Sequence, residues 1–131
     1  MKLLCLALLA CAAFAQKPET VMVTCYAKSG SEADLARVIA RHWTTVRDLK
    51  LATDAGHLTL RGVETGGRTY FVEIFTWRDA AIPDNAPPPV QAIWAEMNQF
   101  ADKIEIAEVE VIGFSAARAP AAAAGGRAPA R

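Results

Sequence analysis

Hydrophobic and polar residues recur with two different periods along residues 16–112, and these periods predict strands and helices in turn. Residues 21–28 are rich in β-branched and aromatic side chains and end at Ser29-Gly30, which predicts a strand. From residue 31 to residue 49 one helical face is formed by five apolar residues and one histidine, namely Leu35, Val38, Ile39, His42, Val46 and Leu49. The sequence Ser31-Glu-Ala-Asp34 matches a capping pattern in which a side-chain oxygen bonds free N–H groups, so the helix is expected to begin there.

The second half of this region predicts a hairpin, a helix and a last strand. Strand-like runs at residues 58–64 and 69–77 flank Thr65-Gly66-Gly67-Arg68, whose glycines permit the positive φ of a tight turn. The three prolines 87–89 suit the first turn of a helix, and apolar residues follow at helical spacing. Residues 104–112 alternate again. The order β-α-β-β-α-β predicts an α+β, ferredoxin-like fold with a four-stranded antiparallel sheet and two helices on one face.

Strand phase places apolar residues on both faces of this sheet. Along residues 69–77 alternate side chains point to opposite sides, with Tyr70, Val72 and Ile74 on one and Phe71, Phe75 and Trp77 on the other. Two helices cover one face, and an exposed apolar patch of roughly several hundred Å² is more than a monomer usually tolerates. A second copy laid sheet against sheet would bury on the order of 1,000 Å² or more. We therefore expect a homodimer.

The two ends of the chain differ in composition from the middle. Residues 1–15 combine Lys2, a leucine-rich run and Ala13-Phe14-Ala15 before Gln16, which is typical of a secretory signal peptide. The run is too short for a permanent membrane span. An alternative is a lipoprotein acylated on Cys11, after Leu8-Leu9-Ala10; the mass of the mature N-terminus distinguishes the two. Residues 113–131, rich in Ala, Pro, Gly and Arg, are expected to form a flexible tail.

Charge and motif content exclude several classes of function. The 131-residue chain carries 14 basic and 14 acidic residues, and residues 16–112 hold ten basic against 14 acidic ones. A nucleic-acid partner is therefore not expected, because such binders show a basic stripe. No P-loop or GxGxxG predicts a nucleotide site. Two histidines without ligand spacing predict no metal site, and Cys25, alone after cleavage, is expected to be a small apolar strand residue rather than a nucleophile.

Two ionisable residues are candidates for acid–base chemistry. His42 lies on the apolar stripe of the first helix, where burial would keep it neutral and able to accept a proton. Glu73 lies in phase with the aromatic side of its strand, where a carboxylate needs a partner. Each also has a structural interpretation: a hydrogen-bonded core histidine, and a carboxylate paired with Arg61 or open to water. A hydrogen bond between His42 and Glu73 would unite the two.

Aromatic residues could form the walls of a binding pocket. Trp43, Phe75, Trp77 and Trp94, together with Tyr26, could surround a flat aromatic ligand, although aromatics at such spacing also form ordinary cores. Trp77, at a strand end, is expected at the mouth. His57 is expected in a loop before the second strand and carries little weight.

The run Tyr70-Phe71-Val72-Glu73-Ile74-Phe75-Thr76-Trp77, followed after a loop by Pro89-Val90-Gln91-Ala92-Ile93-Trp94, resembles the antibiotic biosynthesis monooxygenase-like family of the dimeric α/β-barrel superfamily. The resemblance covers residues 21–112 and implies ferredoxin-like protomers whose sheets close into a barrel. Some members oxidise polycyclic phenols to quinones without a cofactor, some degrade haem, and many have no known activity. Many relatives carry a histidine before the second helix, whereas this chain reads Pro83-Asp84-Asn85-Ala86-Pro87, which argues against haem ligation from that loop without excluding haem altogether.

These observations together predict an exported, homodimeric, monooxygenase-like protein. Its concrete activity would be cofactor-free oxygenation of a phenol or related carbon acid, with His42 or Glu73 as the base. The alternative is a non-catalytic periplasmic binding or interaction module that uses the same cavity.

Overall fold

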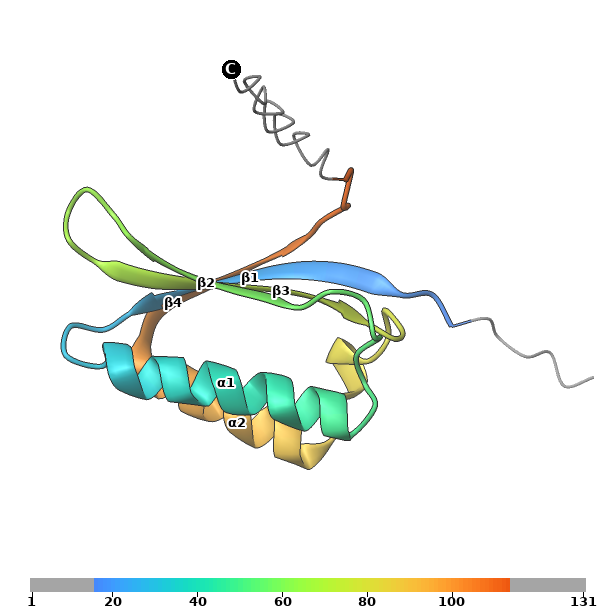
Figure 1. Ribbon diagram of the computed structural model, residues 1–131. Helices are drawn as coiled ribbons and strands as arrows, with labels where there is room; N and C mark the ends of the chain where they lie inside the picture. The colour runs from blue at the N-terminus through green and yellow to red at the C-terminus, as the bar shows by residue number, and fades with distance from the viewer. Residues whose placement is uncertain (1–15, 114–131) are drawn as a thin grey trace, which may run out of the picture.

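A computed structural model of the chain describes residues 16–113, so the expected signal peptide and nearly all of the expected tail lie outside the described residues. The elements are β1 (Glu19–Ala27), α1 (Glu32–Asp48), β2 (Leu58–Val63), β3 (Thr69–Trp77), the short 3-10 helix η1 (Pro83–Asn85), α2 (Pro88–Phe100) and β4 (Ala101–Glu108). The strands form one antiparallel sheet in the order β2-β3-β1-β4, with both helices against one face (Figure 1). This confirms the ferredoxin-like prediction. Within residues 16–113, no helix has the length and apolar character needed to traverse a bilayer.

The ends of α1 are stabilised by backbone bonds. The expected side-chain cap is wrong: Ser31 occupies the N-cap, but its hydroxyl makes no capping hydrogen bond. At the C-terminus, Lys50 takes a left-handed φ of 57°, and the N–H of Leu51 donates to the carbonyl of Val46 at 2.8 Å. This backbone pattern satisfies a free helix carbonyl and turns the chain toward β2.

The hairpin sets the register that positions the site. Gly67 takes φ 84° in the turn, and the N–H of Glu64 donates to the carbonyl of Arg68 at 2.9 Å. The register that follows places Thr59 of β2 opposite Glu73 of β3.

Strand β4 begins and ends earlier than the alternation at residues 104–112 predicts. Its first residue is Ala101, which is also the C-cap of α2, so helix and strand join without a loop. Its last residue, Glu108, pairs with Val21 near the start of β1. The strand ends there because only two residues of β1, Glu19 and Thr20, precede Val21.

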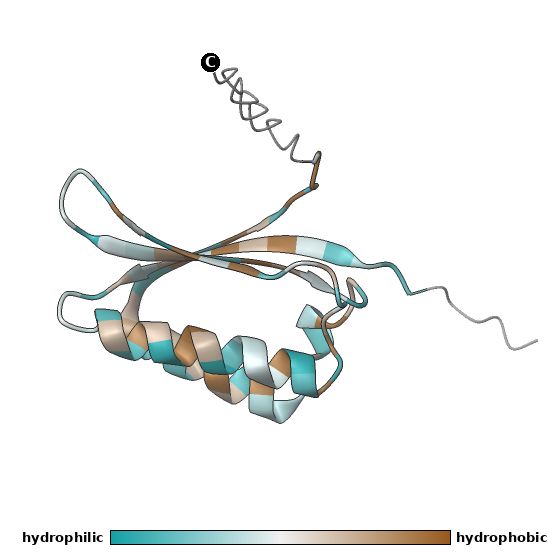
Figure 2. Ribbon diagram, viewed as in Figure 1, coloured by the Kyte–Doolittle hydropathy of each residue, from teal (hydrophilic) through white to brown (hydrophobic). Residues whose placement is uncertain are grey.

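Figure 2 shows apolar residues at intervals along the strands, and the strand register places several of them on the side of the sheet without helices, called the bare face below (Figure 1). Its apolar side chains, placed by strand register, are Met22, Tyr26, Leu58, Leu60, Tyr70, Val72 and Ile74. Leu58 and Leu60 are 44% and 48% exposed. The structure therefore confirms apolar side chains on both faces of β1, β2 and β3, whereas β4 places Lys103 and Glu105 on the bare face.

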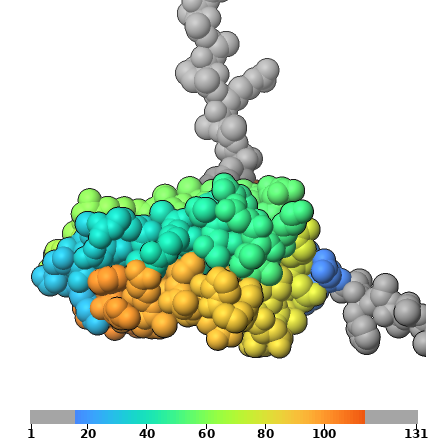
Figure 3. All heavy atoms as spheres, turned by 90° about the horizontal axis from the view of Figure 1, so that it is seen from below, coloured from blue at the N-terminus to red at the C-terminus, as the bar shows by residue number. Residues whose placement is uncertain are grey.

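The other face forms the core with the two helices, which pack side by side across it (Figure 3). The core has two apolar clusters, one around Leu35 and Phe71 and one around Val46 and Phe75. His42 lies between the two clusters on α1, and Glu73 lies between them on β3. The helical and strand periods thus bring two polar side chains to one buried place.

Candidate functional site

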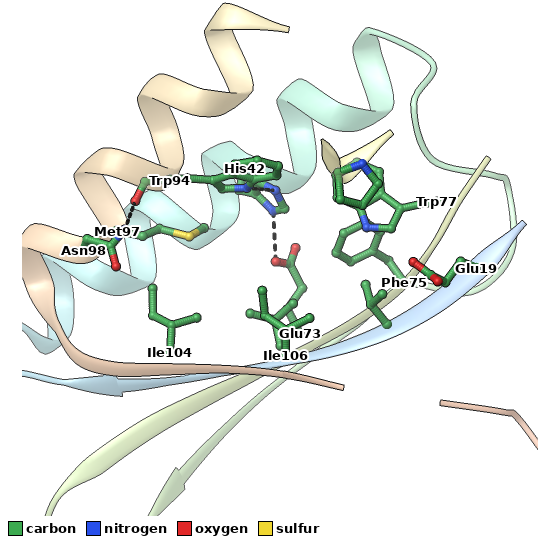
Figure 4. Close-up of a pocket in the computed structure, with 13 residues that line it drawn as sticks. Glu19, His42, Glu73, Phe75, Trp77, Trp94, Met97, Asn98, Ile104 and Ile106 are labelled. Atoms are coloured by element: carbon green, nitrogen blue, oxygen red, sulfur yellow. Dashed lines mark hydrogen bonds and ion pairs between the residues drawn. The ribbon is translucent and has the colours of Figure 1, made fainter. Parts of the chain in front are cut away.

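A pocket of about 510 Å³ lies between α2 and the inner face of the sheet (Figure 4). Its walls are mostly apolar and include Val21, Phe75, Trp77, Trp94, Met97 and Ile104. His42 and Glu73 also line it. The pocket reaches the surface beside β4, where Ile106 is 71% exposed. An apolar cavity with a few convergent polar groups is the usual form of a small-molecule site.

His42 and Glu73 form a buried pair in this pocket. Nδ1 of His42 lies 3.0 Å from Oε2 of Glu73, and their side chains are 4% and 3% exposed. The pairing with Arg61, which was the alternative for Glu73, does not occur. A buried carboxylate needs such partners because it loses the hydration that stabilises its charge.

The indole of Trp94 determines where the proton of His42 lies. Its Nε1–H donates to Nε2 of His42 at 3.1 Å, and an indole can only donate. Nε2 is therefore an acceptor, and in a neutral ring the proton must sit on Nδ1 and point to Glu73. Both ring nitrogens of His42 are engaged, so a substrate that gives its proton to Nε2 must first replace the Trp94 bond.

His57 is the residue that sequence reasoning missed. It lies just before β2, and its Nε2 is 3.1 Å from Oε1 of Glu73 and 3.3 Å from the hydroxyl of Thr59. The signal was present in the hairpin: counting back from its turn puts Thr59 opposite Glu73, and His57, two residues earlier, projects to the same face. Trp94, His42, Glu73 and His57 thus form one continuous chain of hydrogen bonds.

The structure brings three of the five expected aromatic residues to the pocket, and Tyr26 lies on the bare face of the sheet instead. Phe75, Trp77 and Trp94 surround His42, with ring centroids 5.7, 6.3 and 6.4 Å from the imidazole. Trp43 is not among the residues that line the pocket; it stacks on His57 with centroids 3.9 Å apart, beside a groove between α1 and β2. It points elsewhere because it follows His42 directly, and successive helical residues project about 100° apart.

Cys25 is buried in the core, as expected. It is 2% exposed, and burial, aided by the charge of Glu73, raises the pKa of its thiol to about 12. The thiol therefore stays protonated at neutral pH and does not act as a nucleophile.

This pKa predicts a loss of stability at alkaline pH. Above pH 9 the unfolded thiol ionises while the folded thiol keeps its proton up to about pH 12, so the free energy of unfolding falls as the pH rises. The fall is about 1.4 kcal/mol per pH unit. Between pH 8 and pH 10.5, urea unfolding should show the wild type losing about 2 kcal/mol more than Cys25→Ala. Equal losses would contradict this origin.

No histidine nitrogen in the described wall of the pocket is free to ligate haem. His42 is the histidine that lines it, and both nitrogens of that ring are hydrogen-bonded. The segment 83–87 contributes Pro83 to the wall and contains no histidine. Within residues 16–113, no group of three or more His, Cys, Asp or Glu side chains is arranged to hold a metal ion.

Comparisons with known proteins agree with this architecture at the level of fold. No family model and no curated protein matches the chain. Among solved structures, a mutant of SnoaB, a cofactor-independent oxygenase from Streptomyces nogalater, is 18% identical with a TM-score of 0.57, over 75% of this chain and 97% of that one. An antibiotic biosynthesis monooxygenase is 14% identical with a TM-score of 0.57, over 74% and 100% of the two chains.

A Mycobacterium tuberculosis protein is also similar, at 12% identity and a TM-score of 0.53, over 76% of this chain and 99% of that one. All three likenesses span nearly the whole of the matched structures. The chain therefore has the fold of the antibiotic biosynthesis monooxygenases, the resemblance expected from its sequence.

Proposed function

We propose that this protein is a cofactor-independent oxygenase that acts on a hydroxylated aromatic molecule. The observation that carries the proposal is the buried His42–Glu73 pair in the wall of an apolar pocket surrounded by aromatic rings. A planar aromatic substrate fits such walls, and a histidine held by a carboxylate is a suitable base. The fold shared with a cofactor-independent oxygenase supports the same reaction class.

The reaction would begin with proton transfer to His42. A substrate O–H, or an acidic C–H beside it, replaces the indole N–H at Nε2 and gives up its proton there. Glu73, which accepts the Nδ1–H at 3.0 Å, stabilises the imidazolium that results. The substrate carbanion then reduces O2: a CH2 group becomes C=O, one oxygen atom enters the product and the other leaves as water.

Oxygen consumption tests this proposal. The purified protein is incubated with a panel of polycyclic phenols, and O2 uptake is measured with an electrode. We expect uptake above the uncatalysed rate and, under 18O2, a ketone or quinone product that carries one labelled oxygen atom. Uptake no faster than in the protein-free control, across a panel whose members quench the pocket tryptophans, would contradict the oxygenase proposal.

That last result would favour a second candidate, a non-catalytic binding protein. The Trp94 bond is the observation that favours it, because Nε2 of His42 is already satisfied within the fold. In a binding protein of this kind, His42 would keep the Trp94 bond and stabilise the pocket without accepting a proton from the ligand.

The proposal also includes a homodimer formed through the bare face. The apolar centre of this face is bordered, at the hairpin end, by polar and charged side chains. There the hydroxyl of Tyr26 donates to Glu105 at 3.0 Å, and the guanidinium of Arg68 lies 4.5 Å from the centroid of the Tyr26 ring. Hydrogen bonds from Lys103 and Tyr26 lower the pKa of Glu105, so this carboxylate is charged at neutral pH. An apolar core with a polar rim is typical of protein interfaces.

Export is the third part of the proposal. The charged Lys2, the apolar run and the Ala13-Phe14-Ala15 site support secretion, with the mature chain beginning at Gln16.

A further inference from the structure

The carboxylate of Glu73 lies within hydrogen-bond distance of two histidines, His42 and His57. Glu73 uses separate oxygens for them, Oε2 for His42 at 3.0 Å and Oε1 for His57 at 3.1 Å. The His57 side chain is 19% exposed, whereas those of His42 and Glu73 are 4% and 3% exposed. The chain of hydrogen bonds thus runs from the buried pocket to a side chain that water can reach.

Glu73 can balance one positive charge but not two. If both rings were protonated, two cations would share one anion in a poorly solvated place, which is costly. The two histidines therefore compete for the charge of the same carboxylate. The side chain of His57 is partly exposed to water, and its ring stacks on Trp43 with the ring centroids 3.9 Å apart.

We propose that His57 is a positioning residue that controls the basicity of His42 through Glu73. When His57 is protonated, its positive charge offsets the negative charge of Glu73, and His42 becomes a weaker base. When His57 is neutral, the full charge of Glu73 stabilises a proton on His42. The catalytic consequence rests on the proposed function, in which His42 is the base; the coupling itself rests on the geometry alone.

Few other ionisable groups face this triad. From β1 comes Cys25, which is a neutral thiol, and from β2 comes Arg61, which lines the same groove as His57. Toward the pocket, α2 presents Trp94, Met97 and Asn98 and β4 presents Ile104 and Ile106, none of which titrates. Glu19 also lines the pocket but lies beside Trp77, away from Glu73 (Figure 4). The ionisable groups that contact one another directly at this site are therefore His42, Glu73 and His57.

Proton titration by NMR tests the coupling without any substrate. The chain contains two histidines, so in His57→Gln every imidazole signal of tag-free protein belongs to His42. Glutamine keeps an N–H donor for Glu73 but cannot carry the charge. We expect the NMR signal of His42 to titrate at higher pH in this variant than in the wild type, and that of His57 to titrate at higher pH in His42→Gln.

Matched measurements separate this role from a structural one. Thr59→Val removes the neighbour of His57 without removing its charge and should leave the coupling intact. In the wild type, both signals should follow a two-step curve. Independent one-step curves, or a His42 titration unchanged in a folded His57→Gln, would overturn the proposal. Coupled titration without O2 uptake would refute only the oxygenase, whereas O2 uptake without coupling would refute only this role of His57.

Discussion

Val72→Glu should convert the protein from a dimer to a monomer. Val72 lies on the bare face in the interior of the sheet, with Leu60 of β2 on one side and Thr24 of β1 on the other. In a dimer that joins two bare faces, the new carboxylate would be buried against apolar side chains without a partner. Burying such a charge weakens the dimer by several kcal/mol, which raises the dissociation constant by roughly a hundredfold or more. In the monomer the side chain reaches water, so the fold should persist.

Sedimentation velocity at micromolar concentration measures this outcome. We expect the wild type to sediment at twice the protomer mass and the variant at once that mass, with unchanged circular dichroism. Ala92→Glu is the matched control, because it adds the same charge on the exposed surface of α2 and should remain dimeric. A monomeric wild type would refute the dimer, and a dimeric Val72→Glu would place the interface on another surface.

Glu73→Gln and His42→Gln should each reduce oxygenation at least a hundredfold. In the wild type, each of the two carboxylate oxygens of Glu73 contacts a ring nitrogen of one histidine. Glutamine replaces one of these oxygens with an NH2 group, which cannot accept a hydrogen bond. It also removes the negative charge that stabilises a protonated His42. Loss of a positioned base typically costs about 10² to 10⁴ in rate.

The measurement is initial O2 uptake as a function of substrate concentration. Phe75→Leu is the control: it reshapes the pocket wall while leaving the hydrogen bonds of His42 and Glu73 in place, so it should raise KM more than it lowers kcat. Thermal unfolding verifies that each variant is folded. Full activity in folded Glu73→Gln and His42→Gln would place the chemistry elsewhere.

Much of the fold follows from local patterns in the sequence. The period of α1 placed His42 on the buried side, and strand alternation placed Glu73 with Phe71 and Phe75. The glycines of the hairpin turn and the prolines of α2 marked where elements begin and end. These predictions succeeded because backbone geometry alone dictates the direction of a side chain on a regular element.

Predictions of partners were weaker, since a partner depends on elements distant in the chain. Trp43 was expected in the pocket because it is aromatic, yet it directly follows His42 on α1, and adjacent helical positions point in different directions. Arg61 was one of the alternative partners for Glu73, whereas the uncharged Thr59 lies directly opposite it and His57 lies within hydrogen-bond distance. A favourable charge does not determine which side chain is close enough to bind.

The amino-acid sequence by itself determined the order of the elements, the two apolar faces of the sheet and the burial of His42. The tertiary structure alone decided that Trp94 from α2 donates to the ring of His42 and that His57 shares the carboxylate of Glu73. The physical reason is the distance along the chain over which each kind of interaction acts. Periodicity and turn chemistry act over a few residues, but this hydrogen-bond network joins side chains up to 52 positions apart, and only the packing of helices against the sheet sets their distances.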